Sequence, residues 1–255
     1  MATGRTVSKW LRLWGNGYPL CGYTQTVGPL VHSFDEVDVT TVCDSAKGYL
    51  PGMCSINMGT LVGVFDNTAT SGLHALASGA NSVWDMLIAL GIRAEPAQGD
   101  PVFMGKFLQT SYQAAEAGGA VIANAKFTSW DANDRPTYNQ PWGVLLHASS
   151  AVTAVNSSTG VDGGASSALG GYMMVQVLAG NGTATLKVQH AAVNADGSFA
   201  DLGGCTTGVV SMATPFAQIY NTTAVTTTVN QFTRWQIVLG TATSVTFLLS
   251  FARGR

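Results

Sequence analysis

The stretch from residue 38 to residue 66 constrains the fold most, because it reads as two extended segments joined by a turn. Residues 40–42 form a short strand that enters a polar loop, and Leu-Pro-Gly at residues 50–52 supplies the residue types of a tight turn. Apolar positions then alternate with polar or glycine positions through residues 55–65, the period of a strand with one buried face. The pattern predicts one long β-hairpin.

Charge is scarce along the whole chain. Of its 255 residues 10% are charged and 46% are hydrophobic, whereas about 25% of an ordinary soluble domain is charged. The apolar content is ample for a core, and a net charge of −2 gives no basic surface for sequence-independent nucleic-acid binding. A nearly neutral surface favours a protein that packs against copies of itself.

Most of the first half of the chain also reads as strand. Residues 10–30 are rich in aromatic side chains and contain a Gly-Asn-Gly turn at residues 15–17, which indicates two extended pieces. Residues 102–112 and 120–130 form two more strands, separated by Gly-Gly at positions 118 and 119. The sequence therefore predicts an N-terminal β-sandwich or barrel.

One helix is predicted, over residues 71–91. Its apolar residues recur close to a 3.6-residue period, Ser82 followed by Asp85 resembles an N-cap, and Gly91 is a suitable C-terminal stop. Because glycine weakens helices, Gly79 moves the expected start towards Ser82. An apolar helix of this kind is expected to pack across a sheet.

Proline and turn-forming residues at 131–141 end the first part and predict two domains, residues 1–147 and 148–255. The first contains 8 basic and 11 acidic residues, and the second is almost uncharged. Short strands separated by glycine-rich turns predict an antiparallel β-sandwich in the second. The expected strands are residues 172–178, 184–190, 208–212, 218–229, 235–239 and 244–251, with turns at 180–182, 196–197 and 203–204.

No side-chain pattern predicts catalysis, a metal or a cofactor. The four histidines are scattered, the four cysteines show no C-x-x-C pair, and the acidic cluster at residues 131–134 lacks the glycine and distal glutamate of a calcium loop. A bridge between Cys43 and Cys54 stays open, with free thiols favoured. Trp130, Trp142 and Trp235 are consistent with a sugar-binding surface, although packing is favoured because aromatic residues dominate cores and interfaces.

Two segments are relevant to whether the chain is secreted or spans a membrane. The N-terminus lacks the apolar core of a secretory signal. Residues 235–252 are uncharged and long enough for a membrane span, but their alternation around Gly240 favours a β-hairpin instead. The sequence therefore predicts no membrane association.

Residues 20–147 resemble the tail tube proteins of long-tailed, siphovirus-like bacteriophages. The pieces that carry the resemblance are Leu-Cys-Gly-Tyr-Thr-Gln-Thr-Val at 20–27, the hairpin with Tyr-Leu-Pro-Gly at 49–52, Met-Gly-Thr-Leu-Val-Gly-Val-Phe-Asp at 58–66, the single helix, Gly-Asp-Pro at 99–101, and Gly-Val-Leu-Leu-His at 143–147. The second part resembles the β-sandwich domains that some of these proteins carry outside the tube.

The resemblance implies a non-enzymatic virion protein, made in the bacterial cytoplasm, whose stacked hexameric rings form the tube through which DNA leaves. Its implied partners are further copies of itself and the tape measure, tail terminator and distal tail proteins, while DNA passes without specific binding. The long loop would reach a neighbouring subunit or ring. We therefore expect intersubunit contacts at Asp44, Lys47, Tyr49, Leu50, Pro51 and Met53.

Two other functions remain open from the sequence. The second part is also consistent with a carbohydrate-recognising sandwich of a host-adhesion protein, and the whole chain with a capsid decoration or head–tail joining protein. Glycan binding at Trp142 or Trp235 would indicate the first, and the position in a virion would identify the second.

Overall fold

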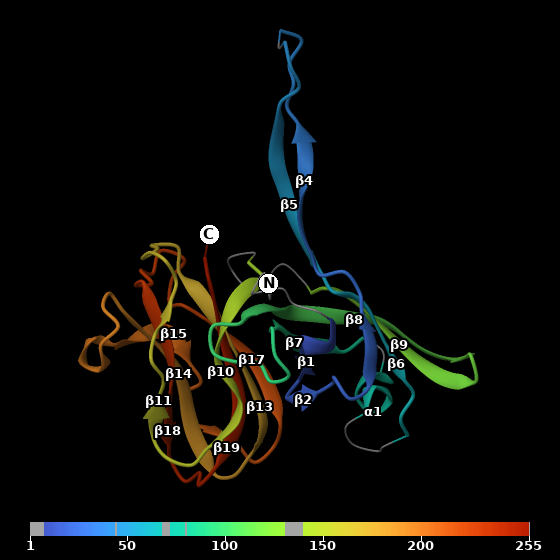
Figure 1. The fold of residues 1–255 in the computed structure, drawn as a ribbon. Coiled ribbons are helices and arrows are strands. Elements are labelled where there is room, and N and C mark those ends of the chain that lie inside the picture. Colours follow the sequence, from blue (N-terminus) through green and yellow to red (C-terminus); the bar gives the residue numbers. More distant parts are fainter. Residues whose placement is uncertain (1–7, 44, 68–71, 80, 131–139, 255) are drawn as a thin grey trace.

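The computed structural model describes residues 8–43, 45–67, 72–79, 81–130 and 140–254. The described chain is mainly β, which confirms the predicted fold class. It contains an eleven-stranded sheet, a six-stranded sheet and a separate two-stranded sheet (Figure 1). The strand pairs in all three are antiparallel.

Strand β8 (Pro101–Ala117) organises the first half of the chain. Its first part pairs with β7 (Val83–Leu90), which continues to β1 (Leu11–Gly15) and β2 (Tyr18–Pro19). Its later part pairs with β9 (Ala120–Ser129), which continues to β6 (Gly59–Val64) and β3 (Thr24–Val27). The strands predicted at 102–112 and 120–130 are confirmed. A short 3₁₀ turn, η1 (Ser8–Trp10), precedes β1.

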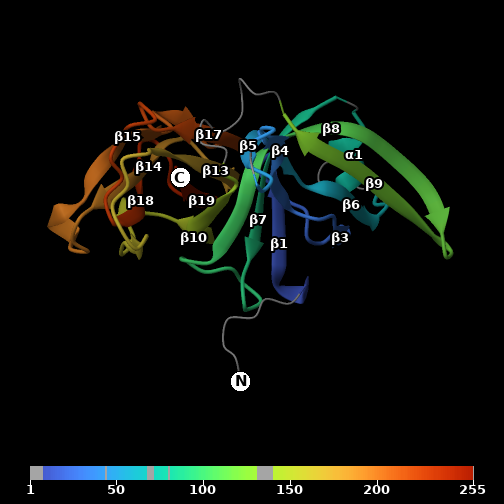
Figure 2. The same ribbon diagram turned by 90° about the horizontal axis from the view of Figure 1, so that it is seen from above.

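These strands curve around one apolar core (Figure 2). Large side chains from several strands are fully buried there, so the curved sheet is held by packing as well as by its hydrogen bonds. The largest of them are Leu13, Leu20, Met58, Leu61, Leu73, Trp84, Phe103, Phe107 and Phe127.

The predicted turn at residues 15–17 joins β1 to β2. Asn16 and Gly17 have positive φ angles of 51° and 85°, as a tight two-residue hairpin requires. A Cβ on Gly17 would lie 2.5 Å from the Phe216 backbone nitrogen, so only glycine fits. The Gly17 N–H donates a 2.7 Å hydrogen bond to buried Gln176, which joins this turn to the second half of the chain.

The helix predicted over residues 71–91 is wrong in most of its length. Helix α1 spans Leu73–Ala77 only, and Val83–Leu90 is strand β7 in the middle of the large sheet. Six consecutive residues of β7 are buried, because both of its faces are covered. A continuous apolar run is compatible with both the helical period of 3.6 residues and the strand period of two. Pairing with β1 on one side and β8 on the other makes this segment a strand.

The second half forms the predicted antiparallel sandwich. One layer belongs to the large sheet and contains β10 (Trp142–Val152), β19 (Val245–Arg253), β13 (Gly171–Gly180) and β17 (Phe216–Asn221). The six-stranded sheet is the other layer, and a core that includes Val175, Val188 and Phe247 fills the space between them. Its strands are β11 (Asn156–Ser157), β12 (Val161–Asp162), β14 (Thr183–Ala191), β15 (Ala200–Thr206), β16 (Val210–Ser211) and β18 (Phe232–Leu239).

Three details of the second half differ from expectation. The strand predicted at 218–229 is shorter, because β17 ends at Asn221. The glycines at 203 and 204, predicted to form a turn, lie inside β15, beside a register irregularity of its pairing with β14. Residues 235–252 do form two strands, but β18 and β19 lie in different sheets and are not a hairpin. No helix among the residues that the structure describes has the length and apolar character to cross a membrane. A second 3₁₀ turn, η2 (Asp196–Ser198), includes the predicted turn at 196–197.

The large sheet runs without interruption from one half of the chain to the other. The predicted boundary after residue 147 falls inside β10, which pairs with β8 on one side and β19 on the other. Tyr172 of β13 is fully buried at this junction, and its hydroxyl donates a 2.6 Å hydrogen bond to the Gln140 carbonyl oxygen. The division into two domains stays a prediction, and the sheet itself is shared.

Candidate assembly arm

A two-stranded hairpin projects from the body of the molecule (Figure 1). Its strands are β4 (Val31–Asp38) and β5 (Tyr49–Asn57), and residues 39–48 connect them. We call residues 31–57 the arm. Apart from the base, where Cys54 and Ile56 of β5 are buried, its side chains are largely exposed. The arm is therefore a thin extension with both broad faces open over most of its length.

The predicted hairpin exists, but its strands differ from those expected. Residues 40–42 lie in the connecting loop, and β4 ends before them at Asp38. The returning segment is divided: β5 ends at Asn57, and β6 then joins the large sheet. Gly59, with a φ angle of +67°, lies where the chain changes direction between β5 and β6. The regular alternation across residues 55–65 therefore spans two strands and not one.

The Leu-Pro-Gly segment does not form the turn that was predicted. Leu50 and Pro51 lie within β5, opposite Val37 and Glu36 of β4. Proline is tolerated in this strand because a two-stranded sheet has two open edges, where no N–H donor is needed. The register shifts just beyond this point, so Gly52 and Met53 form a bulge.

Hydrogen bonds order the loop at the end of the arm. The Val39 N–H donates to the Gly48 carbonyl oxygen at 2.9 Å, and the Gly48 N–H donates to the Thr40 hydroxyl at 3.0 Å. The Thr40 backbone N–H donates to the Asp38 carboxylate at 2.9 Å. Hydrogen bonds from the Thr40 hydroxyl and backbone lower the pKa of Asp38, so this carboxylate stays charged on the exposed arm.

The two faces of the arm differ in chemistry. Directly opposed residues of an antiparallel pair share a face, so Val37 lies beside Leu50, and Val39 follows on the same face. Gly52 lies beside Val37 on this face. A Cβ added to Gly52 would lie 3.0 Å from the Val37 side chain, so there is little room for a larger residue. The other face carries Glu36 and Asp38 opposite Pro51 and Tyr49. We call the face with Val37, Val39 and Leu50 the apolar face, although Asp35 also lies on it, and the face with Glu36 and Asp38, which also carries Phe34 and Tyr49, the acidic face.

The residues predicted to make intersubunit contacts lie together on this arm, with one exception. Lys47, Tyr49, Leu50, Pro51 and Met53 are all exposed there, whereas Asp44 lies outside the described residues. The sequence interpretation missed other exposed apolar side chains of the arm, although the alternation of Val37, Asp38 and Val39 is a strand signal. Those side chains are Phe34, Val37, Val39 and Val42.

An isolated two-stranded hairpin is at best marginally stable in water. This arm exposes 57% of Leu50 and 78% of Met53, and its base, at Cys54 and Ile56, packs into the core of the first half. Contiguous exposed apolar surface on a soluble protein indicates a binding site. The geometry of the arm therefore fits protein association.

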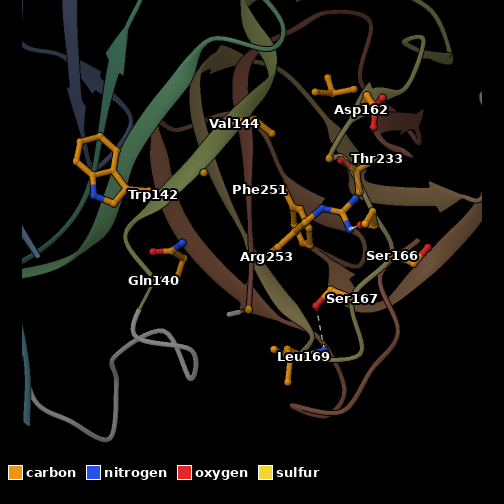
Figure 3. A pocket seen from close by; sticks show the side chains of 15 residues that line it. Gln140, Trp142, Val144, Asp162, Ser166, Ser167, Leu169, Thr233, Phe251 and Arg253 are labelled. Atoms are coloured by element: carbon orange, nitrogen blue, oxygen red, sulfur yellow. Dashed lines mark hydrogen bonds between the residues drawn. The ribbon is translucent and has the colours of Figure 1, made fainter. Parts of the chain in front are cut away.

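A cavity of about 490 Å³ lies near Trp142 in the second half of the molecule (Figure 3). Arg253 lines it, but its guanidinium donates to the Val229, Asn230 and Gln231 carbonyl oxygens. The Trp142 ring points away from Arg253 and packs edge-on against Phe103. The Arg253 cation is therefore already hydrogen-bonded to the backbone, and glycan binding here stays an untested alternative.

Trp235 and the other candidate groups have structural surroundings. Trp235 is 6% exposed and packs edge-on against the rings of His147 and Phe247. None of the four cysteines, all in the described part of the chain, forms a disulfide; Cys54 is buried and Cys43 is exposed. Among the described residues, no three histidine, cysteine or acidic side chains lie close enough together to hold a metal ion.

Comparison with known proteins gives structural likeness only. No protein-family model matches the chain, and no curated protein matches it in sequence. Two of the similar solved structures come from an extracellular contractile injection system, PVC, in the extended state: one is described as its sheath–tube complex and the other as its sheath/tube terminator. Each has 13% identity and a TM-score of 0.41 over 51% of this chain, and they are covered over 90% and 96% of their lengths.

A third similar structure is the Dit protein of phage SPP1, described as part of a hub adsorption apparatus in phages that infect Gram-positive bacteria. It has 11% identity and a TM-score of 0.35, over 94% of this chain and 98% of that protein. Scores this low do not assign a family. The functional argument therefore rests on the geometry of this chain.

Proposed function

We propose that this protein is a non-enzymatic structural subunit of a phage tail, which associates with copies of itself through the arm. The arm is the observation that carries the proposal: it holds two strands outside the body of the molecule and exposes seven large apolar side chains. A monomer gains nothing from this exposure, whereas an assembly buries it.

The composition supports the same proposal. A chain with 10% charged residues keeps few charged side chains to discourage association, and association through strands and hairpins covers open edges. In its finer form, the proposal is a tube of stacked, hexameric rings, with the second half of each chain outside. Tape measure, terminator and distal tail proteins are the further proposed partners, and DNA passes through the lumen during ejection without specific binding.

The proposal predicts that the purified protein forms rings or tubes when concentrated. We expect closed particles in negative-stain electron microscopy, with the number of subunits measured by mass photometry. A variant in which Asn-Gly replaces residues 39–48 should fold but stay monomeric, because it loses the end of the arm. Val193→Asn, at an exposed position in a loop of the second half, is the control and should assemble normally.

Folding of each variant is checked by its thermal unfolding midpoint. A wild-type chain that remains monomeric at high concentration, also in the presence of tail components, contradicts the proposed function. Normal particles from the arm-shortened variant contradict the role given to the arm.

A further inference from the structure

A groove in the first half of the molecule is complementary to the arm in charge. It lies between the open edges of β1 and β3, and its volume is about 530 Å³. β3 pairs only with β6, and β1 pairs with β2 only through Trp14 and Gly15, so the two edges that border the groove are not joined. The curved sheet of the first half therefore remains open along this seam.

The groove is cationic. Lys9 and Arg12 are the only charged side chains that line it, and neither forms an ion pair within the described part of the chain. The Arg12 guanidinium donates to the Lys9 and Leu11 carbonyl oxygens, which holds it beside the β1 edge. Burial is the main cause of the raised pKa of Cys21, and the nearby Glu95 carboxylate acts in the same direction but does not line the groove.

The groove also has apolar and polar walls. Leu11 and Val27 are half-buried on opposite sides of it, and both pack against the core beneath. Thr24 lines the β3 side, and its buried hydroxyl has no hydrogen-bond partner among the described residues. An unsatisfied hydroxyl of this kind is unfavourable, and a small rotation towards an occupant of the groove would satisfy it.

We propose that this groove receives the arm of a second copy of the chain. The acidic arm face, with Glu36 and Asp38, would lie against Lys9 and Arg12, and the apolar face would cover Leu11 and Val27. The arm extends away from its own body in Figure 1, so the occupant comes from another copy.

This inference rests on the proposed function, because it names the surface that the assembling arm contacts. It is tested by charge reversal in the full chain. One variant carries Glu36→Lys and Asp38→Lys, a second carries Lys9→Glu and Arg12→Glu, and a third carries all four substitutions. Analytical ultracentrifugation measures the concentration at which each assembles, and thermal unfolding verifies the fold.

We expect each two-residue variant to need at least tenfold more protein to assemble, because like charges then face each other. The four-residue variant should assemble within threefold of the wild-type concentration, since its charges are again complementary. Glu116→Lys and Lys126→Glu, on β8 and β9, are the matched single-charge controls and should assemble like the wild type.

Cross-linking gives a second readout that does not depend on charge. A chain with Val39→Cys in the arm and Gln25→Cys in β3 should form oxidised, cross-linked multimers on a non-reducing gel. The combination of Val39→Cys with Ser211→Cys, on β16, should not exceed the background given by the native cysteines.

Three outcomes overturn the inference. Normal assembly of the Lys9 and Arg12 variant, failure of the four-residue variant to recover, or absence of the Gln25 cross-link each excludes this groove as the arm's binding site. If shortening the arm still abolishes assembly in those cases, the proposed function stands and only the groove is wrong. If the wild-type chain never assembles, both are rejected.

Discussion

His147 is a buried histidine whose surroundings favour its neutral form. Its ring stacks on Phe247 at 4.0 Å between centroids, Nδ1 lies 3.0 Å from the Phe247 carbonyl oxygen, and Nε2 lies 3.2 Å from the Ser150 hydroxyl. Burial lowers the pKa of His147 from 6.5 to about 4, against the smaller opposing effect of the hydrogen bond to Phe247. Protonation is therefore coupled to unfolding.

The resulting prediction concerns acid stability. Above pH 6.5 both the folded and unfolded forms of His147 are neutral, so its contribution to stability is complete, and it is lost as the pH falls through the folded pKa of about 4. At about 1.4 kcal/mol per pKa unit, the loss is about 3 kcal/mol. Denaturant unfolding of wild type and His147→Gln between pH 7 and 4 measures it, and equal pH slopes in the two proteins would refute this coupling.

Leu50 is expected to be important for association and unimportant for folding. It is 57% exposed on the apolar face of the arm, so Leu50→Asp should change the free energy of unfolding by no more than about 0.5 kcal/mol. Burying a leucine in an interface contributes about 1.5–3 kcal/mol, so the concentration required for assembly should rise about tenfold or more.

Val209→Asp is the matched control for this substitution. Val209 is 76% exposed in the second half of the chain, and its substitution should leave assembly unchanged. Light scattering across a dilution series compares the two variants. Equal behaviour would show that the apolar face of the arm is not an interface.

At the scale of elements, strands next to turn signals could be predicted from the sequence. These include β13, which has seven consecutive buried residues and is followed by the predicted turn at 180–182, whereas β7 was not predicted. β8 and β9 meet at the Gly-Gly turn that the sequence indicates, because both glycines adopt the positive φ angles, 62° and 83°, that a two-residue hairpin turn requires. The helical period assigned to residues 83–90 failed because every position of β7 packs against something. The order of apolar and polar residues within a segment does not indicate which distant segments will pack against it.

The arm shows the same limit at its turn. Pro51 and Gly52 have the chemistry of a turn, and their sequence neighbourhood gave no sign that β4 would extend to pair with them. The pairing of Val37 with Leu50 makes this segment a strand and not a turn, since the two strands then align these apolar residues on one face. The candidate contact residues were found on the arm because they are exposed whether they lie in a turn or in a strand.

At the scale of the whole molecule, the two halves depend on each other. A core formed by Trp14, Leu87, Met104 and Leu145 from the first half continues through Tyr172, Met174 and Leu248 from the second. The fully buried Gln176 side chain also donates to the Asp85 carbonyl oxygen at 2.8 Å. Separating the halves would expose both this apolar surface and these polar groups.

We therefore predict that a chain ending at residue 147 is poorly soluble, unfolds at a lower temperature than the intact protein, and binds a hydrophobic dye. Co-expression with residues 148–255 should restore a soluble complex, because β10 and β19 can still pair if the ends of β10 associate. Size-exclusion chromatography and thermal unfolding measure both effects. A soluble, stable fragment of residues 1–147 would show that the predicted domain folds independently.

The sequence by itself determined the mainly β class, the turns at Asn16-Gly17 and Gly118-Gly119, and the exposure of Tyr49, Leu50 and Met53, because each depends on local periodicity or backbone preference. Only the tertiary structure decided that residues 83–90 form a strand, that one sheet crosses residue 147, and that the arm stands apart from the body. Those features follow from contacts between distant segments, which a local pattern does not encode.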